Sequence, residues 1–505
     1  MSPLKKKPNI LVIMTDTQRC DTLNFMGNPH AVSPNLDRLA KEGVSFKQTH
    51  SSSPVCMPTR CSFLTGVHTP VHGCIENSFQ RKEHLTVLPD LLKEQGYTNI
   101  MVGKTHFGAI PESFDVQHIT YEKPLAVEDA YTEHLKRHGY DRAAHHRHPT
   151  PIPEEIYMEA YLVDNTIQEI ERVVAEGQTP FFAICSMFSP HSPVDPPGRW
   201  ASLYDTIPLP EINYVEGEET ALPPTIQNLL GFIEKGINEE DIKLIGTAFF
   251  NEALGRTFKK EQADAINKLR RLYYGLTAYC DAQAGRLIEY LDRSGLREET
   301  LVIFTSDHGQ QYYDHGFNDK HNYYDASWRV PLIMSMPGTI PQGETRDFAI
   351  WNDLTTTILA VAGTSYQPMQ GFDLFTPIVQ GEESPRRCAV GTLFTTCALA
   401  TKRWKIEYYF EDVTGRLFDR RNDFLERKDL FYNPDYKEVK NELLTALLTW
   451  RASIGDLQHL NEQRGRLVGP VARRARTHLG TVRGTDAEQR LNEKAEQIDR
   501  ETEDI

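Results

Sequence analysis

The chain has 505 residues, 39% hydrophobic and 25% charged, values typical of a soluble globular protein with two or three domains. Its 55 basic and 70 acidic residues give a net charge of −15, which argues against nucleic acid, anionic membranes and, at first sight, anionic substrates. Apolar runs are too short for a membrane span or a secretory signal, and eight cysteines in such a length do not indicate a disulfide framework. We therefore expect a cytoplasmic protein.

Four short, continuous apolar runs, at residues 9–14, 98–102, 180–188 and 300–305, are typical of parallel strands buried on both faces. Helical patterns lie between or beside them, at residues 35–41, 87–94, 156–174 and 263–291. This alternation predicts an α/β domain over residues 1–375, built on a large, mixed, mostly parallel sheet sandwiched by helices. Shorter β-like segments and a helix at 436–453 then predict a smaller C-terminal α+β domain over residues 376–455.

Three segments lack a clear apolar period. Residues 192–260 are rich in proline and acidic groups, and we expect an excursion that shapes a substrate pocket. Residues 456–505 form a polar C-terminal extension, basic in the middle and acidic at its end, which is either solvated or wraps a subunit. Pairing of its opposite charges across a two-fold axis would make a homo-oligomer. The histidines between 134 and 148 are interpreted as a solvated insertion, with a substrate-rim contact as the alternative.

Residues that follow the apolar runs are candidates for a functional site, because ligands of open α/β sheets bind beyond the carboxyl ends of the strands. These positions hold Asp16, Lys104, His106, His191, Asp307 and His308. In isolation each has an ordinary interpretation: an aspartate after a strand is often a helix cap, a lysine is usually solvated, and a histidine between prolines is usually part of a loop.

Residues 53–66 contain the most informative motif. Pro58 stands where a helix begins, which places Cys56 at a helix N-terminus, where negative charge is stabilised. Arg60, four residues later, shares that helix face and lowers the pKa of a neighbouring nucleophile. The alternatives are a buried structural cysteine or a zinc cluster with Cys20, Cys61 and Cys74, but the paired spacing of structural zinc sites is missing.

The sequence Cys-Met-Pro-Thr-Arg at residues 56–60, followed by Leu-Thr-Gly at 64–66, resembles the C-x-P-x-R signature of formylglycine-dependent sulfatases. Further motifs of that family follow in the same order through most of the chain, at residues 8–10, 33–39, 103–108, 305–309, 329–332, 417–419 and 422–426. The resemblance implies an alkaline-phosphatase-like fold and hydrolysis of a sulfate ester to an alcohol and sulfate. It also implies that a formylglycine-generating enzyme oxidises Cys56 to formylglycine, whose hydrate is the nucleophile.

The same resemblance implies a role for each candidate residue. A divalent metal ion would be held by Asp16, Asp307, His308 and the modified Cys56. Arg60 would stabilise the geminal diol, and Lys104 and Lys320 would contact both the diol and the sulfate. His191 or Lys320 would protonate the departing alcohol, and His106 would deprotonate the second hydroxyl to expel sulfate. The resemblance also makes Asn77 a candidate for the lining of the sulfate pocket.

Two positions depart from the commonest family pattern. Thr17 replaces a frequent second aspartate, and His308 replaces a frequent asparagine. An imidazole makes the site less purely oxygen-based, so Mn²⁺ becomes a candidate beside Ca²⁺.

Four alternatives to a plain sulfatase differ in what they require. A phosphonate monoester or phosphodiester hydrolase of the same superfamily would share the metal site, but it would lack the Lys104–His106 pair. A binding protein without activity would not need the full set of nucleophile, cations and metal ligands. A thiol enzyme would keep Cys56 unmodified, and a sulfatase of broad specificity would also accept phosphonates. For the substrate we expect a small or saccharide sulfate ester, because the excursion is long and polar.

Overall fold

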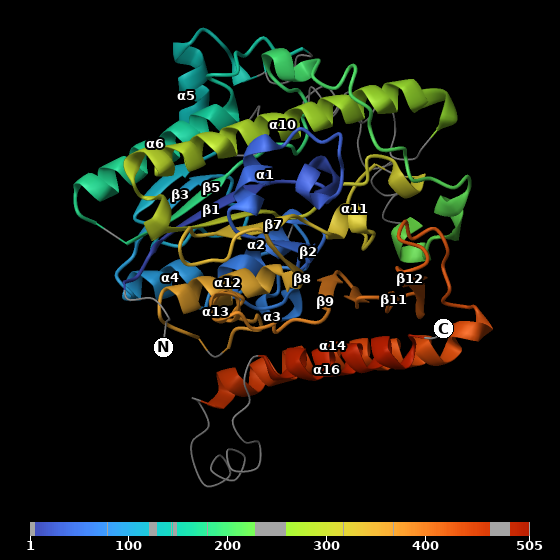
Figure 1. The fold of residues 1–505 in the computed structure, drawn as a ribbon. Helices are drawn as coiled ribbons and strands as arrows, with labels where there is room; N and C mark the ends of the chain where they lie inside the picture. The colour runs from blue at the N-terminus through green and yellow to red at the C-terminus, as the bar shows by residue number, and fades with distance from the viewer. Residues whose placement is uncertain are drawn as a thin grey trace.

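The computed structural model describes residues 6–77, 79–120, 129–142, 144, 149–178, 180–227, 259–316, 318–366, 368–464, 485–503 and 505. A large sheet lies between two layers of helices, and a smaller sheet with two long C-terminal helices lies beside it (Figure 1). Within these ranges no helix is both long and apolar enough to cross a membrane. The expected fold class is confirmed.

The large sheet has eight strands: β1 Asn9–Thr15, β2 Val44–His50, β3 Thr98–Gly103, β4 Val116–Ile119, β5 Phe181–Ser186, β6 Thr300–Ser306, β7 Leu332–Ser335 and β8 Glu344–Ile350. Their order is β4-β3-β5-β1-β6-β7-β2-β8, and among these strands only β7 runs antiparallel to its neighbours. The four strands predicted from apolar runs are therefore the four adjacent central strands β3, β5, β1 and β6.

Each central strand is buried on both faces. In β1, Leu11 and Ile13 belong to one hydrophobic core, whereas Ile10 and Val12 belong to another on the opposite face. The first core is covered by α1 Pro34–Lys41, α6 Met158–Ala175 and α10 Ala263–Ser294. The second is covered by α2 Cys56–Thr65, α4 Leu88–Glu94, α12 Trp351–Val361 and α13 Phe375–Gln380. Burial on both faces explains why these strands are almost continuously apolar.

Short helices complete the large domain: α3 Thr69–His72, α5 Ala130–Arg137 and α11 Asp325–Trp328. The histidine-rich insertion contributes His134, which is partly buried on α5, and His138, which is exposed and follows the end of α5. Its other histidines lie outside the described residues, as does the part of the excursion from 228 to 258. The rest of the excursion contains 3-10 turns at Gly198–Ala201 and Glu218–Ala221.

The smaller sheet is an antiparallel meander of β9 Ala389–Leu393, β10 Thr396–Ala400, β11 Trp404–Tyr409 and β12 Thr414–Asp419. Helix α14 Lys437–Arg464 packs on it, and α16 Asp486–Glu501 packs beside α14 (Figure 1). The part of the C-terminal extension that forms α16 is not solvated throughout, because Ala487, Leu491, Ala495 and Ile498 belong to the core of this domain. The basic stretch at 465–484 lies outside the described residues, and the domain limits at 375 and 455 remain predictions.

A buried chain of charges joins α16 to the large domain. Arg386 pairs with Asp353 at the start of α12 and, at 2.9 Å, with Glu488 of α16. Glu488 also accepts hydrogen bonds from Trp450 at 2.5 Å and from the ring of His68 at 2.9 Å. Burial alone would raise the pKa of Glu488, but His68 and Arg386 outweigh it and lower that pKa to about 2.

This lowered pKa predicts an acid-dependent contribution of Glu488 to stability. The carboxylate stabilises the fold by about 3 kcal/mol above pH 4.5, and the contribution is lost as pH falls from 4.5 toward 2. Urea unfolding of wild type and Glu488→Gln should therefore show a gap in unfolding free energy at pH 7 that shrinks by about 1 kcal/mol at pH 3.5. A gap that does not change with pH would contradict this assignment.

Candidate active site

The four central strands bring their following residues to one edge of the sheet. Backbone hydrogen bonds continue beyond the strands, from Asp16 N to Ser189 O at 3.4 Å and from Lys104 N to Ser186 O at 3.0 Å. Asp307 N likewise donates to Thr15 O at 3.3 Å. The candidate residues after these strands are thus held by the sheet itself rather than by free loops.

Four potential metal ligands meet at this edge: Asp16, Cys56, Asp307 and His308. One ligand atom from each lies within 4.8 Å of the others, and all four side chains are buried. His308 Nδ1 donates to Gly309 O at 2.7 Å, which leaves Nε2 to face Cys56 Sγ at 2.9 Å. That orientation is the usual one for a histidine that ligates a metal through Nε2. Cys20, Cys61 and Cys74 are not part of this cluster.

Arg60 contacts both carboxylates of this cluster. Its Nε lies 2.8 Å from Asp307 Oδ2, and its Nη2 lies 3.1 Å from Asp16 Oδ2. Nη1 donates to Ser186 Oγ at 2.8 Å and to Lys104 O at 3.1 Å. The arginine is thus fixed at every nitrogen, while Asp307 Oδ1 accepts from Thr17 N at 3.0 Å and from His308 N at 2.9 Å, and Asp16 Oδ1 accepts from Thr17 Oγ1 at 2.6 Å.

Cys56 is the first residue of α2, as the position of Pro58 predicted. All ten residues of this helix are buried, and it ends at Gly66, whose φ of 69° is the left-handed conformation that glycine tolerates. Asn77 Oδ1 accepts a hydrogen bond from Met57 N at 3.0 Å, so Asn77 caps the helix that carries the cysteine. This contact places Asn77 beside the site.

The surroundings of Cys56 favour an anion. Burial and the Asp16 carboxylate raise the pKa of the thiol, but Lys104, Lys320 and His308 outweigh them and hold that pKa well below its usual value. Lys320 Nζ lies 3.3 Å from the sulfur, and Lys104 Nζ lies 2.5 Å from Asp16 Oδ2. A nucleophilic oxyanion at this position would meet the same two cations.

The two remaining histidines lie near the same edge. His191 is partly buried, and its Nδ1 donates to Ser192 O at 2.8 Å, which leaves Nε2 for proton exchange. Burial and Lys320 lower the pKa of His191, against a smaller opposing effect of Asp16. His106 is partly buried two residues after Lys104 and has a φ of 45°.

Two supporting residues were not anticipated. Ser186, the last residue of β5, accepts a hydrogen bond from Arg60, and Glu159 Oε1 of α6 accepts one from Ser189 N at 2.9 Å. Glu159 is fully buried beneath the loop that carries His191, and burial raises its pKa. An acid on the apolar face of the predicted helix at 156–174 is the signal that would have indicated it.

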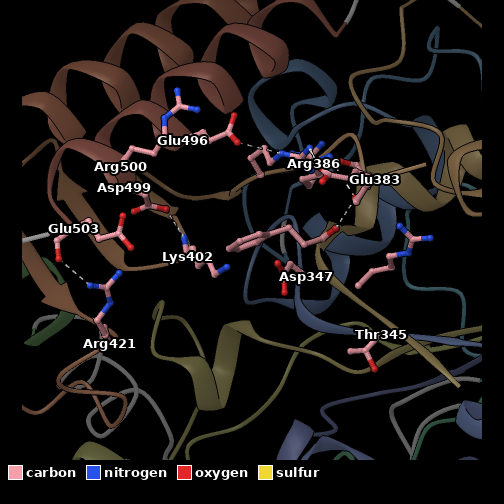
Figure 2. Close-up of a pocket in the computed structure, with 14 residues that line it drawn as sticks. Thr345, Asp347, Glu383, Arg386, Lys402, Arg421, Glu496, Asp499, Arg500 and Glu503 are labelled. Carbon is pink, nitrogen blue, oxygen red and sulfur yellow. Dashed lines mark hydrogen bonds and ion pairs between the residues drawn. The ribbon is translucent and has the colours of Figure 1, made fainter. Parts of the chain in front are cut away.

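A separate cavity of about 510 Å³ lies between β8, residues 383–387 and α16 (Figure 2). It is lined by cationic and anionic side chains in similar number: Arg346, Arg386, Arg387, Lys402, Arg421 and Arg500, together with Asp347, Glu383, Glu496, Asp499 and Glu503. None of the candidate active-site residues lines it. Its mixed charge does not match that of a sulfate ester.

Comparison with known proteins finds two matching family models and several relatives. The Sulfatase family model matches residues 8–364, and the model of the C-terminal region of N-sulphoglucosamine sulphohydrolase matches residues 313–453. An arylsulfatase of Clostridium perfringens is 27% identical over 467 residues, covering 86% of this chain and 92% of the relative.

Two solved structures share the fold. A phosphonate monoester hydrolase of Agrobacterium radiobacter superposes with a TM-score of 0.76 at 22% identity, covering 88% of this chain and 95% of that chain. A structure in complex with its substrate D-glucosamine-2-N,6-O-disulfate superposes with a TM-score of 0.69 at 21% identity, covering 87% and 96%.

A buried cysteine at a helix N-terminus thus lies among cations and potential metal ligands at the edge of an α/β sheet, in a fold shared with a phosphonate monoester hydrolase. The chain belongs to the sulfatase family. It is accordingly a sulfuric ester hydrolase.

Proposed function

We propose that this sulfatase cleaves sulfate esters with formylglycine at position 56 and one divalent metal ion. The observation that carries the proposal is the meeting of Cys56 with Asp16, Asp307 and His308 under Lys104 and Lys320. The Cys56 sulfur stands in for a hydroxyl oxygen of the hydrated aldehyde. That hydrate supplies one hydroxyl to attack sulfur and a second whose deprotonation releases sulfate.

The donor set fits a divalent metal ion. Two buried carboxylates, an imidazole nitrogen turned toward Cys56 and the residue-56 side chain itself offer four ligands close together. We propose Ca²⁺ or Mn²⁺, since carboxylates suit both and the imidazole of His308 favours Mn²⁺. When bound, the ion would acidify the attacking hydroxyl and neutralise charge on a sulfate oxygen.

The chain's own residues divide the remaining work. Arg60 keeps both carboxylates in place, and Lys104 and Lys320 neutralise charge that grows on the sulfate in the transition state. His191 or Lys320 supplies the proton for the leaving alcohol: burial lowers the pKa of His191, whereas Cys56 and Asp16 outweigh burial and raise the pKa of Lys320. His106 accepts the proton of the second hydroxyl, and Asn77 lines the sulfate pocket.

We propose a saccharide sulfate ester as the substrate class. The relative in complex with D-glucosamine-2-N,6-O-disulfate supports it, as does the partly polar excursion at 192–227. The phosphonate monoester hydrolase of Agrobacterium radiobacter, with its TM-score of 0.76, is the observation that favours the alternative, a phosphonate monoester or phosphodiester hydrolase.

One experiment separates these functions. Protein co-expressed with a formylglycine-generating enzyme is stripped of metal, reloaded with Ca²⁺ or Mn²⁺, and assayed on an aryl sulfate, a glucosamine sulfate and a phosphonate monoester. We expect the sulfate esters to have the higher kcat/KM, with activity restored by one of the two ions. Faster turnover of the phosphonate would select the alternative function, and mass spectrometry showing only thiol at residue 56 in active protein would overturn the formylglycine mechanism.

The proposal also covers the maturation of the enzyme, its cellular location and its oligomeric state. A formylglycine-generating enzyme is the required partner, because Cys56 has to be oxidised to formylglycine, and the burial of Cys56 in the folded protein favours modification before α2 packs. All eight thiols are unpaired, which supports a reducing, cytoplasmic location. The homo-oligomer remains a prediction that size-exclusion chromatography with light scattering can test.

A further inference from the structure

Lys320 reaches the active site from a segment without helix or strand. Residues 318–324 have no regular secondary structure, yet Lys320 Nζ lies 3.3 Å from Cys56 Sγ. The position of the Lys320 ammonium group must therefore be set by contacts along the segment. Lys104, in contrast, directly follows strand β3, which sets its position.

Within the large domain, Asn322 supplies the first of these contacts. Its Nδ2 donates to Lys320 O at 3.2 Å, and its Oδ1 accepts from Tyr324 N at 3.1 Å and from Gln311 Nε2 at 2.6 Å. These bonds curl the segment around one side chain. A backbone hydrogen bond from His321 N to Pro54 O, at 3.3 Å, attaches the segment to the loop before α2.

The C-terminal sheet supplies a second attachment, further along the segment. Lys405 of β11 is fully buried, and its Nζ donates to Tyr323 O at 2.6 Å. The same nitrogen pairs with Glu426 and lies 3.5 Å from Asp325 Oδ1. Glu426 Oε2 in turn accepts a hydrogen bond from Asp325 N at 3.0 Å. The Lys405–Glu426 ion pair of the C-terminal domain thus binds the carbonyl of Tyr323 and the amide of Asp325, three and five residues after Lys320.

Stability alone does not account for this ion pair. Buried ion pairs are often no more stabilising than apolar side chains of the same size, because both charges lose their hydration. An apolar residue at position 405 would fill the same space but would leave Tyr323 O without this donor. What distinguishes Lys405 from an apolar residue is therefore that it fixes the position of the segment.

We propose that Lys405, paired with Glu426, is a positioning residue that sets the place of Lys320 in the active site. The proposal rests on the proposed role of Lys320 in sulfate ester hydrolysis. It assigns to the C-terminal domain a function in the reaction, exerted through the backbone of residues 320–325. Displacement of the Lys320 ammonium group by about 1 Å is enough to reduce kcat strongly.

The test is a double-mutant cycle with an aryl sulfate. Lys405→Met should lower kcat by about 10- to 100-fold, with a smaller change in KM. In a Lys320→Ala background the same substitution should have no further effect on kcat, because the group it positions is absent. An equal fold-loss in both backgrounds would overturn the proposal.

A matched control separates positioning from loss of a buried ion pair. Arg403→Met removes a cation that is 2% exposed and pairs with Asp419 at 2.8 Å in the same sheet. We expect it to reduce urea stability comparably to Lys405→Met but to leave kcat within the error of the assay. If Lys405→Met does not fold, Glu426→Gln keeps the side-chain shape while weakening the pair, and its loss of kcat should also vanish in the Lys320→Ala background.

A structural readout keeps this test independent of the proposed function. If wild type turns over no sulfate ester, the proposed function is wrong. The positioning proposal is then tested by crystallography alone. Crystal structures of wild type and Lys405→Met should then differ at residues 320–323, with Lys320 Nζ withdrawn from residue 56. An unchanged Lys320 in the variant would overturn the positioning role.

Discussion

Cys56→Ala protein is expected to lose sulfate ester turnover by about 10⁴-fold or more, down to the background of the assay. The substitution removes the only side chain at the start of α2 that can become a formylglycine hydrate, and alanine offers no nucleophile. It also removes one of the four potential metal ligands. Initial rates on an aryl sulfate, with metal in excess, measure the loss.

Cys61→Ala is the matched control for that experiment. Cys61 lies on the same helix, five residues later, and is fully buried in the core beneath the sheet. Its replacement should cost some stability through the small cavity it leaves, while formylglycine still forms at residue 56 and kcat is retained. Retained turnover in Cys56→Ala would mean that another nucleophile performs the reaction, and the mechanism would have to be abandoned.

The central part of the fold was predictable because of how it is buried. Parallel strands covered on both faces need apolar residues at nearly every position, so β1, β3, β5 and β6 stand out in the sequence. The edge strand β8 reads Glu-Thr-Arg-Asp before its apolar end, and four of the five residues of β10 are threonine, cysteine or alanine, so neither strand has a distinctive pattern. In α16, apolar residues recur only every third or fourth position within a highly charged segment, which made it read as solvent-exposed.

The same difference applies to the candidate site: residues that follow buried strands could be placed from the sequence, and the others could not. Asp16, Lys104 and Asp307 follow predicted strands, so the geometry of a parallel sheet was enough to gather them at one edge. Lys320 follows no strand, and the segment that carries it is held by scattered contacts, which include those of Asn322 and of Lys405 from another domain. Only the resemblance to sulfatases indicated it, and no pattern within the chain indicated the residues that hold it.

The net charge of −15 illustrates why whole-chain averages say little about a site. Arg60, Lys104 and Lys320 are all at most 8% exposed, and all lie within one cluster of short contacts around Cys56. Charges held in a cleft of low dielectric act strongly on a bound anion, whereas dispersed surface charge is screened beyond about 8 Å at physiological salt. The overall charge therefore does not exclude a sulfate ester as substrate.

Lys104→Met should reduce kcat for a sulfate ester by about 10²- to 10³-fold while leaving the fold intact. Methionine preserves the length of the side chain over the Phe188 ring, which Lys104 Nζ approaches to 5.5 Å. What disappears is the cation 2.5 Å from Asp16, and with it compensation for charge that grows on the sulfate. Asp16 keeps its contact with Arg60 at 3.1 Å, so the carboxylate is not left buried without a partner.

Lys93→Met provides the control for Lys104→Met, because it removes an exposed lysine that pairs with Asp115 at 2.7 Å. Exposed pairs contribute at most about 1 kcal/mol, so this variant should match wild type in both turnover and urea stability. Steady-state kinetics with formylglycine-bearing, metal-loaded protein then measures the effect of Lys104 against an equivalent loss of charge at the surface. Equal turnover of Lys104→Met and Lys93→Met would show that Lys104 has no role in the reaction. A loss of kcat in Lys104→Met with an unchanged free energy of unfolding would show that the charge of Lys104 stabilises the transition state rather than the fold.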